Sequence, residues 1–370
     1  MAEPSIYTVE LRNRTFDLIK VLTKHTSDLS WDYDRIGGCG RCSFNLALRL
    51  LEDINPDYDI QIRLENGAGA SRLAYRGYIE TYHPIMSLMD TVQMDVFGYV
   101  GQLERVRVNH TYNNQEISVI VKDILDNYVM PDTSIEYDEA DIEDTGFVVD
   151  EIVFDDLASN ALKTLADLAG LTEWGVNRNL KFFFKRQNDS ISFYVRQGKD
   201  LKKLDNLDDY SAIVNRINIK GSDGLDETVN NTESQASYGL RTKIISQSSI
   251  TTASVAQKYG SSILSEKAKV NRKTTIQISK NTQFFEETTP LGKISILGGT
   301  VAQAKKYNDD DAIYGNFKYG GMPSYQINKM TYKISGSGTD VNMNAGYARP
   351  DIADEIKRIE FQLNQLRNKT

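Results

Sequence analysis

Two cysteines in a Cys-x-x-Cys spacing, Cys39 and Cys42, are the residues of this chain best suited to redox or metal chemistry. A reactive pair of this kind has its first thiol at a helix N-terminus, where the helix dipole stabilises the thiolate. Here Cys42 leads directly into Ser-Phe-Asn-Leu, which alternates as a strand does. A structural zinc ion needs four ligands, and His25, His83 and His110 have no paired spacing. The pattern therefore favours two small residues in a glycine-rich turn, with a thiol-dependent enzyme as an alternative.

The sequence lacks the short motifs of the common enzyme classes. It has no Gly-x-x-x-x-Gly-Lys-[Ser/Thr], His-Glu-x-x-His or Gly-x-Ser-x-Gly, and no Gly-x-Gly-x-x-Gly follows a strand pattern. The run Asp309-Asp310-Asp311 offers carboxylates, but it lacks the alternating spacing and the glycine of a calcium loop, so a solvated loop is predicted. We therefore predict no catalytic residues, no cofactor and no bound metal.

A group of aromatic residues suggests a second kind of site, a stacking platform for sugars or bases. Trp174 and Val176 alternate into the turn Asn177-Arg178-Asn179, and Phe182, Phe183 and Phe184 follow it. Alternation across a hairpin buries one face and exposes the other, so we expect Phe183 on the exposed face. Core packing explains most of the pattern, and a carbohydrate-binding adhesin remains the alternative function.

Composition limits the class of protein. The chain has 370 residues, with 43 Lys and Arg against 51 Asp and Glu and a net charge of −8. The length predicts about two or three domains. Proteins that grip nucleic acid gain affinity from clustered basic residues, so the acidic balance argues against that class. No run of about 18 apolar residues occurs and no secretory signal is visible, so we expect no membrane span and synthesis in a reducing cytoplasm.

The elements that must position these residues follow from hydrophobic periodicity. Residues 1–110 alternate with period two between turn-rich pieces, which predicts a first antiparallel β-barrel domain. Residues 111–200 predict a small α+β domain with a helix over 117–128, a second helix from a cap at Asp155 or Asp156 to Gly170, and the aromatic hairpin. Residues 201–349 predict a second β-barrel domain.

Two further segments interrupt or end this second β-region. The polar stretch 221–237 predicts a long loop or an arm, and a helix is expected over 251–268. After Pro350, apolar residues recur with spacings of four, three, four and three, as in a coiled coil. This pattern predicts a C-terminal helix over 350–370 and an oligomer seam, although a helix of about twenty residues can also pack on its own subunit. The seam residues are Ile352, Ile356, Ile359, Leu363 and Leu366.

The order of these parts resembles the tail hub, or late-control-D-like baseplate hub, proteins of tailed bacteriophages. The residues that carry the resemblance are the turn at 31–40, Glu-Trp-Gly-Val at 173–176, Lys-Phe-Phe-Phe at 181–184, Tyr-Gly-Leu-Arg at 238–241, Ser-Ser-Ile-Thr-Thr at 248–252 and the closing segment 349–356. The resemblance covers nearly the whole chain.

The resemblance implies a structural protein of the virion rather than an enzyme. Hub proteins have two related β-barrel domains per subunit, and three subunits form a ring of six barrels that continues the six-fold tail tube and presents three-fold symmetry to the tip. The implied partners are two further copies of this chain, the tail tube or distal tail protein on one side, and a tip, fibre or spike protein on the other. Phage DNA would pass through without specific binding. The implied location is the tail tip, after assembly in the host cytoplasm.

Overall fold

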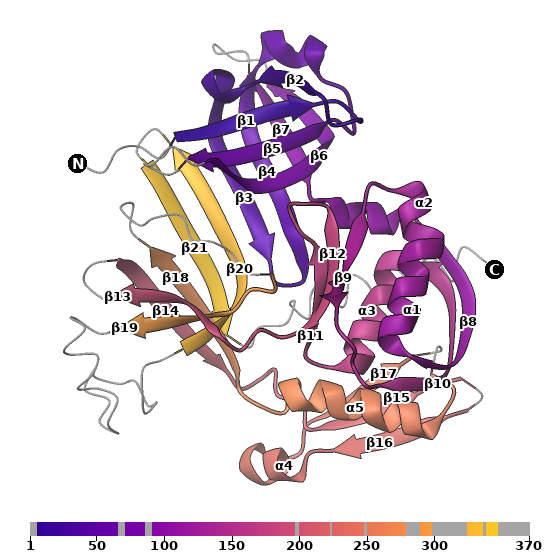
Figure 1. Ribbon diagram of the computed structural model, residues 1–370. Coiled ribbons are helices and arrows are strands. Elements are labelled where there is room, and N and C mark those ends of the chain that lie inside the picture. Colours follow the sequence, from indigo (N-terminus) through magenta and orange to yellow (C-terminus); the bar gives the residue numbers. More distant parts are fainter. Residues whose placement is uncertain are drawn as a thin grey trace.

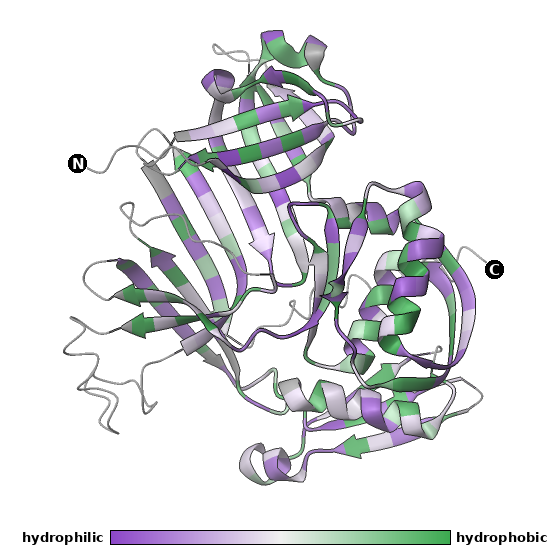
Figure 2. Cartoon of the chain, viewed as in Figure 1, coloured by the Kyte–Doolittle hydropathy of each residue, from purple (hydrophilic) through white to green (hydrophobic). Residues whose placement is uncertain are grey.

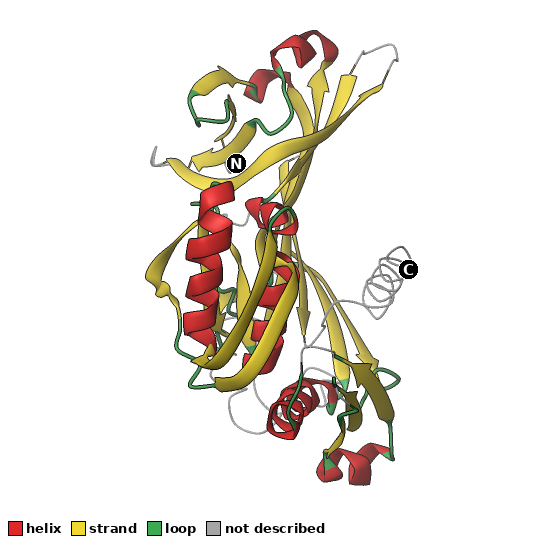
Figure 3. Cartoon of the chain, turned by 90° about the vertical axis from the view of Figure 1, so that its right-hand side faces the viewer, coloured by secondary structure: helices red, strands yellow, loops and turns green. Residues whose placement is uncertain are grey.

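The computed structural model describes residues 6–65, 71–85, 91–196, 200–222, 224–247, 250–278, 289–297, 324–335 and 338–346. Most of this part of the chain is β-structure (Figure 1). The protein is therefore a β-rich α+β protein, as the sequence predicted. Figure 3 shows from the side how helices pack beside long, twisted strands.

The first β-region is an antiparallel sheet formed by strands β1 to β7, which follow one another in the sequence. Its order is β3-β4-β7-β6-β5-β1-β2. The strands alternate buried and half-exposed residues, so the period-two pattern of the sequence marks one face toward the core (Figure 2). Their bounds are β1 Ile6–Arg12, β2 Leu18–Val21, β3 Thr26–Asp34, β4 Gly37–Ala47, β5 Asp59–Glu65, β6 Ser71–Ile85 and β7 Thr91–Phe97. Short 3-10 helices lie at Thr23–His25, Leu48–Asp53 and Tyr99–Glu104.

The second β-region continues the same sheet. Its strands are β13 Ile191–Arg196, β14 Leu201–Asp209, β18 Asn271–Ile278, β19 Lys293–Leu297, β20 Ser324–Ser335 and β21 Gly338–Gly346. They run in the order β14-β18-β21-β20, and β19 and β13 extend the other edge of β20. Since β20 also pairs antiparallel with β3, the two β-regions share one hydrogen-bonded surface. Among the described residues this pairing forms an open path from β14 to β2 rather than a closed barrel.

The helical unit lies between these regions in sequence. It contains α1 Ile117–Ile124, a π-helical segment at Leu125–Val129, α2 Met130–Asp132 and α3 Ala158–Ala169. The remaining elements are β8 Arg107–Glu116, β9 Glu136–Ile142, β10 Val148–Leu157, β11 Thr172–Val176 and β12 Lys181–Arg186. The predicted helix over 117–128 is confirmed and runs on through Pro131. The second helix ends at Gly170 as predicted, where a φ of +66° suits glycine.

Two local predictions in these segments are wrong. Asp155 and Asp156 lie in β10, and Leu157 stands at the N-cap of α3, because pairing with β8 extends to the helix. The polar stretch 221–237 contains β16 Asp226–Asn230 and most of α4 Thr232–Tyr238 instead of a loop. Asn231 caps α4 by accepting a hydrogen bond from the Ser234 backbone N–H. The polar residues of this stretch therefore form a helix cap and a solvent-exposed strand.

A small sheet and a long helix complete the fold. Strand β15 Arg216–Lys220 pairs with β16 on one side and with β17 Thr242–Ser246 on the other. The predicted helix over 251–268 is confirmed as α5 Ala253–Lys267, capped by Thr252. Ile217, Ile219 and residues of α5 join the core of the helical unit, while strands β13, β14 and β18 to β21 join the core of the first β-region. Residues 201–349 therefore contribute to both cores.

The second β-region repeats the strand order of the first. The strands β14, β18, β21, β20, β19 and β13 are neighbours in the same order as β3, β4, β7, β6, β5 and β1. The small sheet and α5 lie in the connection between β14 and β18, where the first region has a tight turn between β3 and β4. The repeat differs in one pairing, since β13 runs parallel to β19 whereas β1 runs antiparallel to β5.

The registers of the two copies also agree. The irregularity in β20 after Ile327 matches the irregularity in β6 after Ile79. When these positions are aligned, buried residues fall on buried residues in strands β4, β5 and β7 and their counterparts. The matched pairs are Phe44 with Ile276, Leu46 with Ile278, Ile60 with Ile294, Met94 with Met343 and Val96 with Ala345.

Candidate assembly site

Strands β3 and β20 join the two β-regions by pairing the edge of one with the edge of the other. Six residues of β3, Leu29 to Asp34, pair in register with Ile334 to Lys329 of β20. On the inner face Trp31 stacks on Tyr332, with ring centroids 5.0 Å apart and planes 10° from parallel. Both rings are buried, so this aromatic pair contributes about 0.5–1.5 kcal/mol beyond its buried area. We call this pair of strands the β3/β20 seam.

The outer face of the β3/β20 seam is polar. The Lys329 Nζ lies 2.6 Å from Asp32 Oδ2 and 3.7 Å from Asp34 Oδ1, and the Thr331 hydroxyl donates to Asp32 over 2.7 Å. Burial raises the pKa of Asp34 from 3.8 to about 6, although the positive charge of Lys329 acts in the opposite direction. Burial by itself would lower the pKa of Lys329, but the two carboxylates raise it. The seam thus joins a stacked apolar face to a charge cluster.

A second junction holds the helical unit against the first β-region. Strand β11 pairs parallel with β4 at two glycines, so that Gly175 lies opposite Gly37 and Val176 opposite Gly38. A Cβ on Gly38 would lie 2.2 Å from the Val176 carbonyl oxygen, and Gly38 has a φ of +78°. Only glycine fits this approach. The turn at residues 35–36 and the two glycines that follow it at the start of β4 therefore receive β11, and we call this contact the docking turn.

A buried ion pair accompanies the docking turn. Arg35 Nε lies 3.5 Å from Glu173 Oε1, and both side chains are nearly inaccessible. Arg35 also donates from its backbone N–H to the Asn328 carbonyl over 2.8 Å. Because Arg35 follows β3, Glu173 lies in β11 and Asn328 lies in β20, one residue connects three parts of the fold. Loss of one member of a buried ion pair costs about 3–5 kcal/mol, so this contact fixes the geometry.

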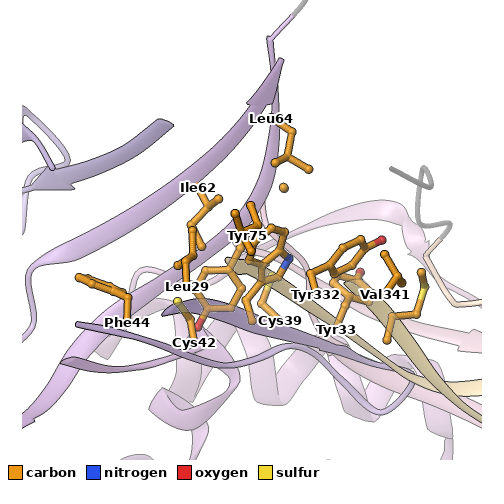
Figure 4. Packing of buried hydrophobic residues seen from close by; sticks show 14 of the residues in the cluster. Leu29, Tyr33, Cys39, Cys42, Phe44, Ile62, Leu64, Tyr75, Tyr332 and Val341 are labelled. Atoms are coloured by element: carbon orange, nitrogen blue, oxygen red, sulfur yellow. The ribbon is translucent and has the colours of Figure 1, made fainter. Parts of the chain in front are cut away.

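The cysteines lie within strand β4, not in a turn as predicted. Both are buried, and they belong to the core shared by the two β-regions (Figure 4). Burial raises the pKa of the Cys42 thiol well above its usual value, so the thiol stays protonated at neutral pH. This environment disfavours a nucleophilic or metal-binding thiolate. Within the described ranges no group of three or more His, Cys, Asp and Glu side chains could hold a metal ion.

The aromatic hairpin has no exposed ring face of the kind that sugar stacking needs. Strands β11 and β12 form the predicted hairpin, with Trp174 opposite Phe184. The expectation that Phe183 is exposed is wrong: Phe182, Phe183 and Phe184 are all fully buried, because this hairpin is covered on both faces. The alternation rule failed here since it assumes that one face meets water.

Other predicted residues lie outside the described part of the chain. The seam residues Ile352, Ile356, Ile359, Leu363 and Leu366 fall in this category, as does the acidic run at 309–311. The oligomer seam stays a prediction. The site found here, the β3/β20 seam, was missed in the sequence because its strands are separated by about three hundred residues. The segment 31–40, which carries part of the hub resemblance, contains the end of β3 but gives no sign of its partner strand.

Comparisons with known proteins place this architecture. No family model and no curated protein matches the sequence. Three solved structures match almost end to end. A 43 kDa tail protein of prophage MuSo2 from Shewanella oneidensis has a TM-score of 0.60 and 13% identity, and the match covers 92% of this chain and 97% of that one. A tail protein from Neisseria meningitidis has a TM-score of 0.63 and 11% identity over 92% of this chain and 96% of that one, and prophage tail protein gp18 from Listeria monocytogenes has a TM-score of 0.58 and 11% identity over 96% and 99% of the two chains. This chain has the fold of prophage tail proteins.

The expected β-rich α+β fold of a phage tail protein is therefore confirmed over nearly the whole chain, although the described residues form no closed barrel. At these identities the likeness concerns the path of the backbone and says nothing about individual side chains. No helix in the described segments is long and apolar enough to cross a membrane.

Proposed function

We propose that this protein is the structural hub of a phage tail tip or baseplate. In this role three copies form a ring that continues the tail tube, adapts six-fold to three-fold symmetry and forms a conduit for DNA. The fold shared with prophage tail proteins supports a structural role in a tail. The buried thiols, the buried aromatic hairpin and the lack of catalytic motifs give no competing site.

The observation that carries the proposal is the internal repeat. Each chain presents the strand order β3-β4-β7-β6-β5-β1 twice, with matching registers and matching buried positions. Three copies would therefore supply six equivalent sheets, which is the number that a six-fold tube requires, while the copies themselves retain three-fold symmetry. The unrepeated parts, the helical unit and α5, would carry the three-fold features toward the tip.

Electron microscopy of the purified chain, combined with light scattering, tests this proposal. The expected result is a ring with three-fold symmetry and a mass three times that of the 370-residue chain. In isolated tails the ring should lie between the tube or distal tail protein and the tip, fibre or spike protein. A chain that stays monomeric in solution and in isolated tails, or a ring of another symmetry, would overturn the proposal.

A further inference from the structure

Each strand of the β3/β20 seam has a counterpart in the other β-region, and the corresponding edge of that counterpart pairs with no strand among the described residues. By strand order, β14 is the counterpart of β3, and β6 is the counterpart of β20. Strand β3 is paired on both edges, with β4 and β20, whereas β14 pairs only with β18 among the described residues. In β20 the segment 329–334 is paired on both edges, with β21 and β3.

The counterpart segment of β6 is open on one edge. Residues 71–78 of β6 pair with β5, and residues 78–85 pair with β7. Backbone bonds from Asp57 and Ile79 carry the β5 side as far as Ile79. Beyond Ile79 no described strand pairs with the edge of β6 opposite β7, and residues 80–84 are exposed on both faces. We call residues 80–85 the open end of β6.

We infer that β14 of one copy pairs antiparallel with the open end of β6 of a second copy, head to tail, in the manner of the β3/β20 seam. This inference deepens the proposed function, because it names the surface through which copies of the hub join. The contact is heterologous, using two different edges of each chain, and such contacts close into rings when the rotation fits. An unpaired edge is also a template for another strand, which supplies the backbone hydrogen bonds.

The alignment of the two repeats gives the register of this contact. In the β3/β20 seam Thr331 lies opposite Asp32. The counterpart of Thr331 is His83, two residues before the end of β6 and four after the matched Ile79, and the counterpart of Asp32 is Leu207 in β14. His83 of one copy should therefore lie opposite Leu207 of the next, with Tyr82 opposite residue 208.

The side chains at these positions suit burial between copies. Leu207 is 59% exposed and Tyr82 is 41% exposed, so both offer apolar area that a strand of a second copy would cover. Met330, the counterpart of Tyr82 within the chain, is fully buried against the neighbouring strands. Pairing between copies would cover Tyr82 in the same way, so that the exposed and buried members of the repeat become equivalent.

A cysteine cross-link tests the register. His83→Cys and Leu207→Cys are introduced together in the full chain, and the purified oligomer is oxidised with copper(II) phenanthroline. We expect disulfides between copies, giving covalent dimers and trimers of the double variant. When the two single variants are mixed, we expect covalent dimers that contain one copy of each. Tyr194→Cys replaces Leu207→Cys as the control, because Tyr194 is 58% exposed but lies on β13. Ser30→Cys with Lys333→Cys, which are opposite each other in the β3/β20 seam, is the intrachain reference.

A second measurement avoids cysteine chemistry. Leu207→Lys with Tyr82→Lys should leave the fold of the single chain unchanged, because both side chains are exposed, and should weaken self-association about five- to tenfold. If a trimer forms but the His83 and Leu207 cysteines link no more than the Tyr194 control, the inferred contact is wrong and the hub proposal stands. If no oligomer forms at all, both are wrong.

Discussion

At the scale of single residues, Asp34 links the chemistry of the β3/β20 seam to stability. Because the folded state raises the pKa of Asp34 from 3.8 to about 6, the folded state binds a proton more tightly than the unfolded chain. Stability from this group is therefore greatest at low pH and falls as the pH rises from about 4 to about 6. The effect should be about 1–2 kcal/mol, since the side chain is 29% exposed.

The expected result is a difference between wild type and Asp34→Asn that depends on pH. Asparagine cannot ionise, so the part of the pH dependence due to Asp34 should disappear in the variant. Relative to wild type, the free energy of unfolding of the variant should therefore be lower near pH 4 than near pH 7. Urea unfolding at the two pH values measures this. A difference that stays constant across the range would show that Asp34 titrates normally.

Gly38 is a residue whose type is set by one close approach. Gly38→Ala would bring a methyl group to within 2.2 Å of the Val176 carbonyl oxygen, in addition to the strain of a positive φ. We expect a loss of about 3 kcal/mol or more in the free energy of unfolding. Gly146→Ala is the matched control, because Gly146 has a similar φ of +65° but open space around it, and should cost about 1 kcal/mol. Equal losses in urea unfolding would contradict the role of Gly38 in docking β11.

At the scale of elements, the sequence predicted what is local and missed what is distant. The periodicity of Ile117 to Tyr128 and the alternation of the first β-region depend on neighbouring residues, so both were found. Phe183 was misplaced because full burial of the hairpin comes from packing by other segments. The β3/β20 seam was missed because it depends on strand order rather than on neighbouring residues. The internal repeat was expected only from the hub resemblance, since residues 210–270 separate β14 from β18 and hide the repeat in the sequence.

The C-terminal segment gives a prediction at the same scale. Ile356→Asp with Leu363→Asp places two charges in the predicted heptad seam, so trimer formation should weaken. Asn364→Asp with Gln365→Asp adds the same charge at outward heptad positions and should leave assembly unchanged. Sedimentation of both variants makes the comparison. A wild-type trimer mass in the seam variant would show that this helix packs elsewhere, and assembly would then depend on the sheet edges.

At the scale of the whole molecule, assembly of three copies into a ring would multiply the effect of the net charge of each chain. Any charged surface of the chain is presented three times around the proposed ring, so a modest excess of one sign becomes a strong field along the axis. The chain carries eight more acidic than basic groups. The three copies together therefore bring a large negative charge to a structure through which DNA is proposed to pass.

This charge leads to a prediction about the channel wall. A wall rich in Lys and Arg would bind phosphates and hold the duplex, because each contact gains free energy from released counterions. We therefore expect a neutral or acidic wall that repels DNA mildly from all sides. The surface potential of the assembled ring, mapped on its experimental structure, is the measurement. Since the field is a sum over three copies, single substitutions should change DNA passage little, whereas reversing many charges should slow it strongly. A channel lined mainly by basic residues would contradict free sliding, and a ring too narrow for a duplex in every state would contradict the conduit.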